Sequence, residues 1–186
     1  FEGTEVYVRR VGNEVVLSAV PPPGVDELLD ALADFEPATA IVRDVDWMAG
    51  RLAEQRTNAA IHSDRLADAA VFHKGIVWAL RYETNLTASD LGLLKRAALR
   101  GRARLQALDS AAPAWADRKG AAIRGYVSIV DGSVQPYGVI VPAGYDSARP
   151  IRLDVVLHGS SRPVGMSELR FASRFNPDDA VEPAPA

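Results

Sequence analysis

The sequence predicts a mixed α/β protein in which strands near both ends of the chain enclose a long helical stretch. Three observations carry this prediction. Apolar residues alternate with polar ones in residues 4–20, recur every three or four positions over residues 25–110, and alternate again from Ala121 onward. The 186 residues, 48% hydrophobic and 24% charged, suit an ordinary globular protein of one or two domains.

The first elements are a hairpin and two helices. Alternating valines flank the turn signal Gly12-Asn13, which predicts a β-hairpin within residues 4–20. Leucines on one side predict a helix over residues 26–35, and Met48 and Leu52, one turn apart, predict another over residues 46–55.

The strongest helix is predicted over residues 63–82. Its apolar face is expected to hold Val71, Gly75, Trp78 and Tyr82, which follow one another at spacings of four, three and four. After it, the sequence from Thr87 to Asp90 resembles a capping box, with Asp in place of the usual Glu or Gln, and predicts the start of a further helix.

That further helix is predicted to be amphipathic. The side expected to face the core carries Leu91, Leu94, Ala98, Leu105 and Leu108. The opposite side carries the basic residues Lys95, Arg96, Arg100, Arg102 and Arg104. Such a run is most simply a solvated helix face, and only secondarily a patch for an anionic partner.

The C-terminal part predicts a hairpin, a strand and a helix. Residues 123–130 and 134–141 flank the turn sequence Asp131-Gly132-Ser133. The apolar run 151–157 predicts a buried strand, and a helix is expected from Ser167 to Phe175, with Ser167 as its N-cap. Trp115, in the connection, is expected to bridge the helices and the sheet.

Composition and charge exclude several classes of function. A net charge of −3 argues against a nucleic-acid partner, and no apolar run is long enough for a membrane span. With no cysteine, thiolate nucleophiles and cysteine-ligated metals are excluded. His62 and His73 lie 11 residues apart without a matching carboxylate pattern, so we expect no metal site and no cofactor. His73 is expected to be a surface or interface residue.

Several segments together resemble a known family. These are residues 72–82, 124–126, 131–138, 152–159 and 167–171, within a stretch from about residue 67 to 175. They look like the region that opens the catalytic domain of prolyl-oligopeptidase-like or esterase-like α/β-hydrolases in large bacterial proteins. The resemblance implies an accessory hairpin and helical region over 1–112, the first strands and first helix of a truncated hydrolase sheet over 113–176, and a disordered tail or linker over 177–186.

The resemblance also implies a site. In such enzymes the third sheet strand runs into a loop whose backbone amides bind the oxyanion, which here would comprise His158, Gly159, Ser160 and Ser161. The histidine of that loop orders it and is not the catalytic base. Ser161 stands where the family has a second glycine. The nucleophile elbow Gly-x-Ser-x-Gly is absent, because Pro163 occupies the last position of the one near match.

We therefore expect an N-terminal portion of a serine hydrolase that lacks its nucleophile, acid and base. Its implied partners are an ester or peptide substrate and a remaining hydrolase domain C-terminal to residue 186, and the resemblance suggests export of the intact protein. The alternative is a non-catalytic helical docking or substrate-gating module of the same lineage, and a third reading is a structural or interaction domain. An open, apolar strand edge would make the chain precipitate or dimerise.

Overall fold

The computed structural model describes residues 7–11, 14–18, 36–83, 85–110, 113, 115–157, 159, 162 and 164–175. Its elements in chain order are β1 (Tyr7–Val11), β2 (Glu14–Ser18), α2 (Glu36–Arg56), α3 (Ser63–Tyr82), α4 (Ala88–Ala107), β3 (Gly120–Val127), β4 (Val134–Val141) and α5 (Ser167–Arg174). The protein is thus of mixed helix and strand composition, as predicted. The predicted helix over 26–35 and the tail 177–186 lie outside the described residues.

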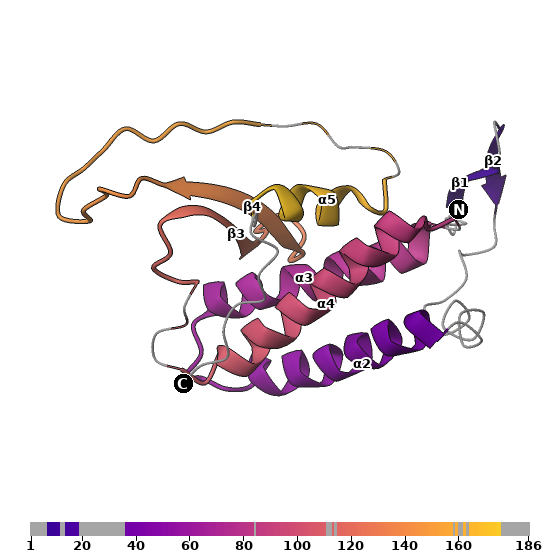
Figure 1. Cartoon of the computed structure of the whole chain (residues 1–186), viewed down its shortest axis with the longest axis horizontal. Coiled ribbons are helices and arrows are strands. Elements are labelled where there is room, and N and C mark those ends of the chain that lie inside the picture. The colour runs from indigo at the N-terminus through magenta and orange to yellow at the C-terminus, as the bar shows by residue number, and fades with distance from the viewer. Residues whose placement is uncertain are drawn as a thin grey trace, which may run out of the picture.

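Helix α3 lies at the centre of the molecule (Figure 1). Helices α2 and α4 cover one side of it, and the β3–β4 hairpin and α5 cover the other. All residues from Ala67 to Phe72 are buried, so this part of α3 is enclosed on every side rather than on one face. Its predicted bounds are confirmed. Two residues of its predicted inner face, Trp78 and Tyr82, are instead 40% and 50% exposed.

Helix α4 begins with the predicted capping box. The Thr87 hydroxyl accepts a hydrogen bond from the Asp90 amide, and the Asp90 carboxylate accepts one from the Thr87 amide. The prediction of a fully solvated basic face is wrong for two residues. Arg100 and Arg104 are buried, and Arg104 reaches the backbone of α3 and β3.

Two antiparallel hairpins make up the described strands. Strand β1 pairs with β2, and β3 pairs with β4 in a register that places Ile123 opposite Gly138. Gly132, in the predicted turn of the second hairpin, has a φ of 70°, a conformation that favours glycine. Both hairpins confirm the sequence prediction. The described residues contain no parallel strand, and no hydrolase sheet is formed among them.

The hairpin packs closely on α3 and α5. A Cβ atom at Gly125 would overlap the carbonyl group of Ala67 on α3, and one at Gly138 would overlap the ring of Phe175 at the end of α5. These two glycines let the sheet approach the helices more closely than any other residue would. Core residues from Ile41 to Ala172, on both sides of the connection near residue 113, belong to one continuous cluster.

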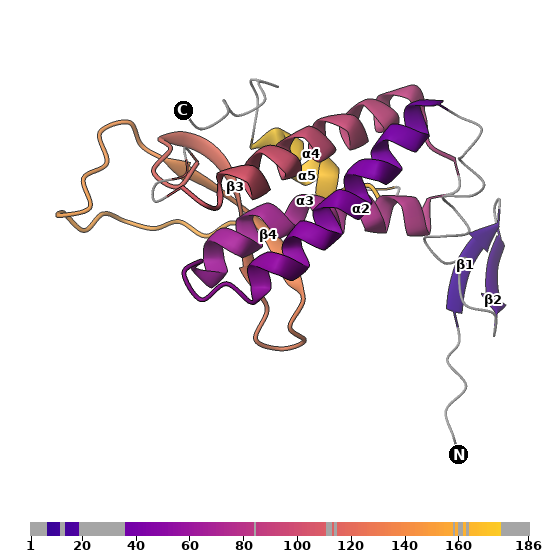
Figure 2. The same cartoon turned by 90° about the horizontal axis from the view of Figure 1, so that it is seen from below.

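The largest departure from the sequence prediction concerns residues 151–157. The segment is extended but pairs with no described strand, and all seven of its residues are exposed. It belongs to an arc between β4 and α5 that lies apart from the helices in Figure 1; in Figure 2, seen from below, part of this arc passes behind them. The prediction of a buried strand is therefore wrong for this structure, since no other described element lies on either of its sides.

Helix α5 also differs from the prediction in its first turn. Ser167 is the first helical residue and Met166 is the N-cap, without a side-chain hydrogen bond to the helix. Contacts with α3 and α4 hold this turn instead. The Lys74 ammonium lies 2.7 Å from a Glu168 carboxylate oxygen, and Arg170 donates a 2.8 Å hydrogen bond to Asp90. In the described part of the chain, no helix has the length and apolar character that a membrane span requires.

Candidate functional site

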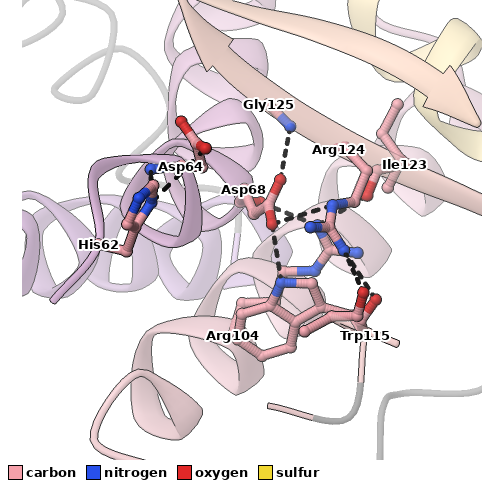
Figure 3. Close-up of polar contacts among 9 residues, drawn as sticks. His62, Asp64, Asp68, Arg104, Trp115, Ile123, Arg124 and Gly125 are labelled. Atoms are coloured by element: carbon pink, nitrogen blue, oxygen red, sulfur yellow. Dashed lines mark hydrogen bonds and ion pairs between the residues drawn. The ribbon is translucent and has the colours of Figure 1, made fainter. Parts of the chain in front are cut away.

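A buried carboxylate joins α3 to the first strand of the β3–β4 hairpin. Asp68 is fully buried, and one of its oxygens accepts a 2.8 Å hydrogen bond from the amide of Gly125 (Figure 3). Its other oxygen accepts a 3.0 Å hydrogen bond from the indole nitrogen of Trp115 and lies 3.1 Å from Nε of Arg124. Trp115 thus bridges the helices and the sheet, as predicted.

Burial and these partners act in opposite directions on Asp68. Loss of hydration raises the pKa of Asp68, and the Gly125 amide, the two guanidinium groups of Arg124 and Arg104, and the Trp115 indole oppose that rise. A buried carboxylate with this many donors holds its neighbours in fixed positions. The arrangement is a structural junction between a helix and a strand.

Arg104 of α4 completes the junction. Its Nη1 atom donates 2.9 Å hydrogen bonds to the carbonyl oxygens of Asp68 and Ile123. The guanidinium also lies over the rings of Phe72 and Trp115, at 5.0 and 5.1 Å from their centroids. Arginine can be buried in this way because its planar group stacks on aromatic rings while donating hydrogen bonds in its own plane.

These contacts close one edge of the hairpin. In an antiparallel pair, opposite residues alternate between those that hydrogen-bond to each other and those whose backbone groups point outward. The Ile123 carbonyl and the Gly125 amide bond to Arg104 and Asp68, so they point away from β4. Side chains of α4 and α3 therefore occupy the positions that a neighbouring strand would take beside β3.

In the described part of the chain, the opposite edge of the hairpin, along β4, has no further strand beside it. Gly138 lies opposite Ile123 and Pro136 lies opposite Gly125, so their backbone groups also point outward, on the far side. Among the described residues, no backbone hydrogen bond joins β4 to anything except its own hairpin. Pro136, without an amide hydrogen, suits such an edge position. Another strand can therefore be added beside β4 but not beside the Ile123–Gly125 stretch of β3.

The exposed segment 151–157 leads into the predicted oxyanion loop. Leu153, Val156 and Leu157 are 82%, 84% and 92% exposed, although such side chains are normally covered. Arg152 and Asp154 form an ion pair of 2.7 Å on one side of the segment. These exposed apolar residues have the composition of a β-strand, but no described strand pairs with them.

Of the four predicted loop residues, only Gly159 is described. It is exposed, its φ is outside the left-handed region, and a Cβ atom there would contact nothing within 4 Å. No backbone conformation or close packing therefore demands glycine at this position. His158, Ser160 and Ser161 lie outside the described residues. The far end of the loop is anchored where the Gly165 amide donates a 2.7 Å hydrogen bond to Glu83.

The two described histidines have separate environments. His62 caps α3, with its Nδ1 accepting a 3.2 Å hydrogen bond from the Asp64 amide. His73 is half-buried, and burial, with a smaller contribution from the positive charge of Arg56, lowers its pKa. The described residues contain no group of three potential metal ligands.

The sequence did not predict the roles of Asp68, Arg104 or Gly125: Arg104 was expected on a solvated helix face, and no role was assigned to Asp68. One signal was present, because Asp68 continues the apolar face of α3 one turn before Val71. An acidic residue on the apolar face of a helix is expected to be buried, and a buried carboxylate needs hydrogen-bond donors or a cation beside it. No such pattern distinguishes Arg104 from Arg96 and Arg102, which are only partly buried.

Comparison with known proteins adds no relative. No protein-family model matches the chain, and searches of curated proteins and of solved structures found no match either.

Proposed function

We propose that the chain is the N-terminal part of a serine hydrolase of the esterase or peptidase type. One observation carries the proposal. An extended, apolar segment, residues 151–157, is exposed along its whole length and leads directly to Gly159. Exposed apolar surface of this kind marks a site of further packing. The open edge of β4 and the closed edge of β3 support a sheet that continues on one side only.

In the proposed enzyme, further strands cover the 151–157 segment and the amides that follow it bind the oxyanion. A serine hydroxyl from the remaining domain adds to the substrate carbonyl carbon while a histidine takes its proton. The leaving alcohol or amine takes that proton, and water then releases the acid from the acyl-serine. The chain contributes only backbone donors to the negatively charged oxygen.

The test uses the full encoded protein and two variants at one position. Gly159→Pro removes an amide hydrogen and is expected to lower kcat for a p-nitrophenyl ester by roughly 10²–10³-fold. Gly159→Ala retains the amide, and its Cβ would contact nothing within 4 Å, so its kcat should stay near that of the wild type.

A fluorophosphonate probe should label the encoded protein at a serine beyond residue 186. The 186-residue chain alone should neither be labelled nor hydrolyse the ester. An encoded protein without a Gly-x-Ser-x-Gly sequence after this region, or hydrolysis by the chain alone, would contradict the proposal.

A second candidate function, the non-catalytic docking module, is favoured by one feature of α3. Trp78 and Tyr82 are both exposed and lie in edge-to-face contact at 5.5 Å, and Lys74 lies 4.7 Å from the Trp78 ring. Exposed aromatic residues beside a cation are typical of protein interfaces. If the encoded protein contains no serine nucleophile, this surface becomes the leading candidate, and Trp78→Ala should weaken capture of its partner.

A further inference from the structure

The exposed segment 151–157 has two different sides. In an extended backbone, alternate side chains point the same way, so Ile151, Leu153, Val155 and Leu157 form a continuous apolar side. Arg152, Asp154 and the exposed Val156 lie on the other side, and the 2.7 Å ion pair between Arg152 and Asp154 agrees with that placement. A strand that pairs with this segment must therefore place apolar side chains on the same side, and an acidic and a basic residue opposite Arg152 and Asp154.

We propose that the segment is a docking strand for a second copy of the chain, and that the two copies pair antiparallel about Leu153. In this register Arg152 of each copy lies directly opposite Asp154 of the other, so two-fold symmetry forms the charge pair twice. On the apolar side Leu153 faces its own equivalent, and Ile151 of each copy faces Val155 of the other.

Charge complementarity selects this register among its neighbours. Antiparallel pairing about Arg152 would place two arginines opposite each other, and pairing about Asp154 would place two aspartates opposite each other. A register shifted by one residue would move the charged side of one copy onto the apolar side of the other. Parallel in-register pairing also stacks like charges. Among the antiparallel registers, which two-fold symmetry allows, pairing about Leu153 brings opposite charges together and keeps the apolar sides in line; a parallel pairing shifted by two residues forms the charge pair only once and is not symmetric.

This inference goes beyond the proposed function: it concerns the 186-residue chain by itself, whereas in the proposed enzyme further strands would take the place of the second copy. Strand pairing over so few residues buries a small area, and we expect a weak dimer with a Kd on the order of 10 µM.

Two single charge variants make the test specific for this register. Arg152→Asp carries two acidic residues, and Asp154→Arg carries two basic ones, so neither can pair with itself.

Sedimentation equilibrium of the 186-residue chain between about 1 and 200 µM tests the proposal. The wild type should dimerise, each single variant should dimerise at least about tenfold more weakly, and an equimolar mixture of the two variants should form a heterodimer of wild-type strength. Asp117→Arg, a charge reversal at an exposed position outside the segment, should dimerise like the wild type. At about 1 µM, where the wild type is mostly monomeric, circular dichroism should show nearly the same unfolding midpoint for all variants, because both residues are exposed.

Three outcomes would overturn the inference. A wild type that stays monomeric at 200 µM leaves the segment to another occupant, such as further strands of a larger sheet. Single variants that dimerise like the wild type place the contact elsewhere. Weak single variants whose mixture stays monomeric exclude this register. None of these outcomes bears on labelling of the encoded protein by a serine probe, so the hydrolase proposal is tested separately.

Discussion

The two long edges of the β3–β4 hairpin meet opposite environments. Along β3, the Ile123 carbonyl and the Gly125 amide bond to buried side chains of Arg104 and Asp68. Along β4, the outward backbone groups meet no described partner, and the chain continues into an apolar segment that is exposed throughout. Side chains of helices can thus occupy the edge of a sheet as fully as a strand does, whereas the edge along β4 has no partner among the described residues.

The largest expected effect comes from breaking the closed edge. Asp68→Ala leaves the Gly125 amide and the Trp115 indole without their buried acceptor and the Arg124 guanidinium without its ion-pair partner, and should lower the free energy of unfolding by about 3–5 kcal/mol. Urea denaturation followed by tryptophan fluorescence measures it. Asp117→Ala, at an exposed position, should change stability by less than about 0.5 kcal/mol. Equal effects of the two substitutions would refute the structural role of Asp68.

A smaller effect is expected from glycines in the two regions. Gly125→Ala places a methyl group against the Ala67 carbonyl and should lower the free energy of unfolding by about 1–3 kcal/mol. Gly144→Ala, in the loop after β4, adds a methyl group with nothing within 4 Å and should not destabilise the chain. If Gly125→Ala proved neutral, the close approach of β3 to α3 would be wrong.

The smallest effect is expected in the open region. Leu157→Ala removes a side chain that is almost wholly exposed, so the free energy of unfolding of the monomer should change by less than about 0.5 kcal/mol. Ile123→Ala, a buried truncation of similar size on β3, should cost about 2–5 kcal/mol. Measurements at about 1 µM keep the chain monomeric. A large loss for Leu157→Ala would mean that the segment is already packed within the monomer.

Local patterns predicted the elements well and their surroundings poorly. The capping box at Thr87, the turn at Gly132 and the bounds of α3 each depend on a few neighbouring residues, and the structure agrees with them. The burial of Arg104 and the exposure of residues 151–157 depend instead on elements that are distant in the sequence. Arg104 is buried because α3 and β3 meet over it, and the 151–157 segment is exposed because no described strand adjoins it.

The junction at Asp68 also has a consequence for the order in which the chain is made. Asp68 and Arg104 both precede β3 in the sequence, and they supply the hydrogen bonds along its outer edge. A ribosome therefore delivers both groups before it delivers the strand that they hold. When residues 120–127 emerge, the acceptor and the donor that bond this strand are therefore already part of the synthesised chain, and β3 can pair with them before β4 has been made.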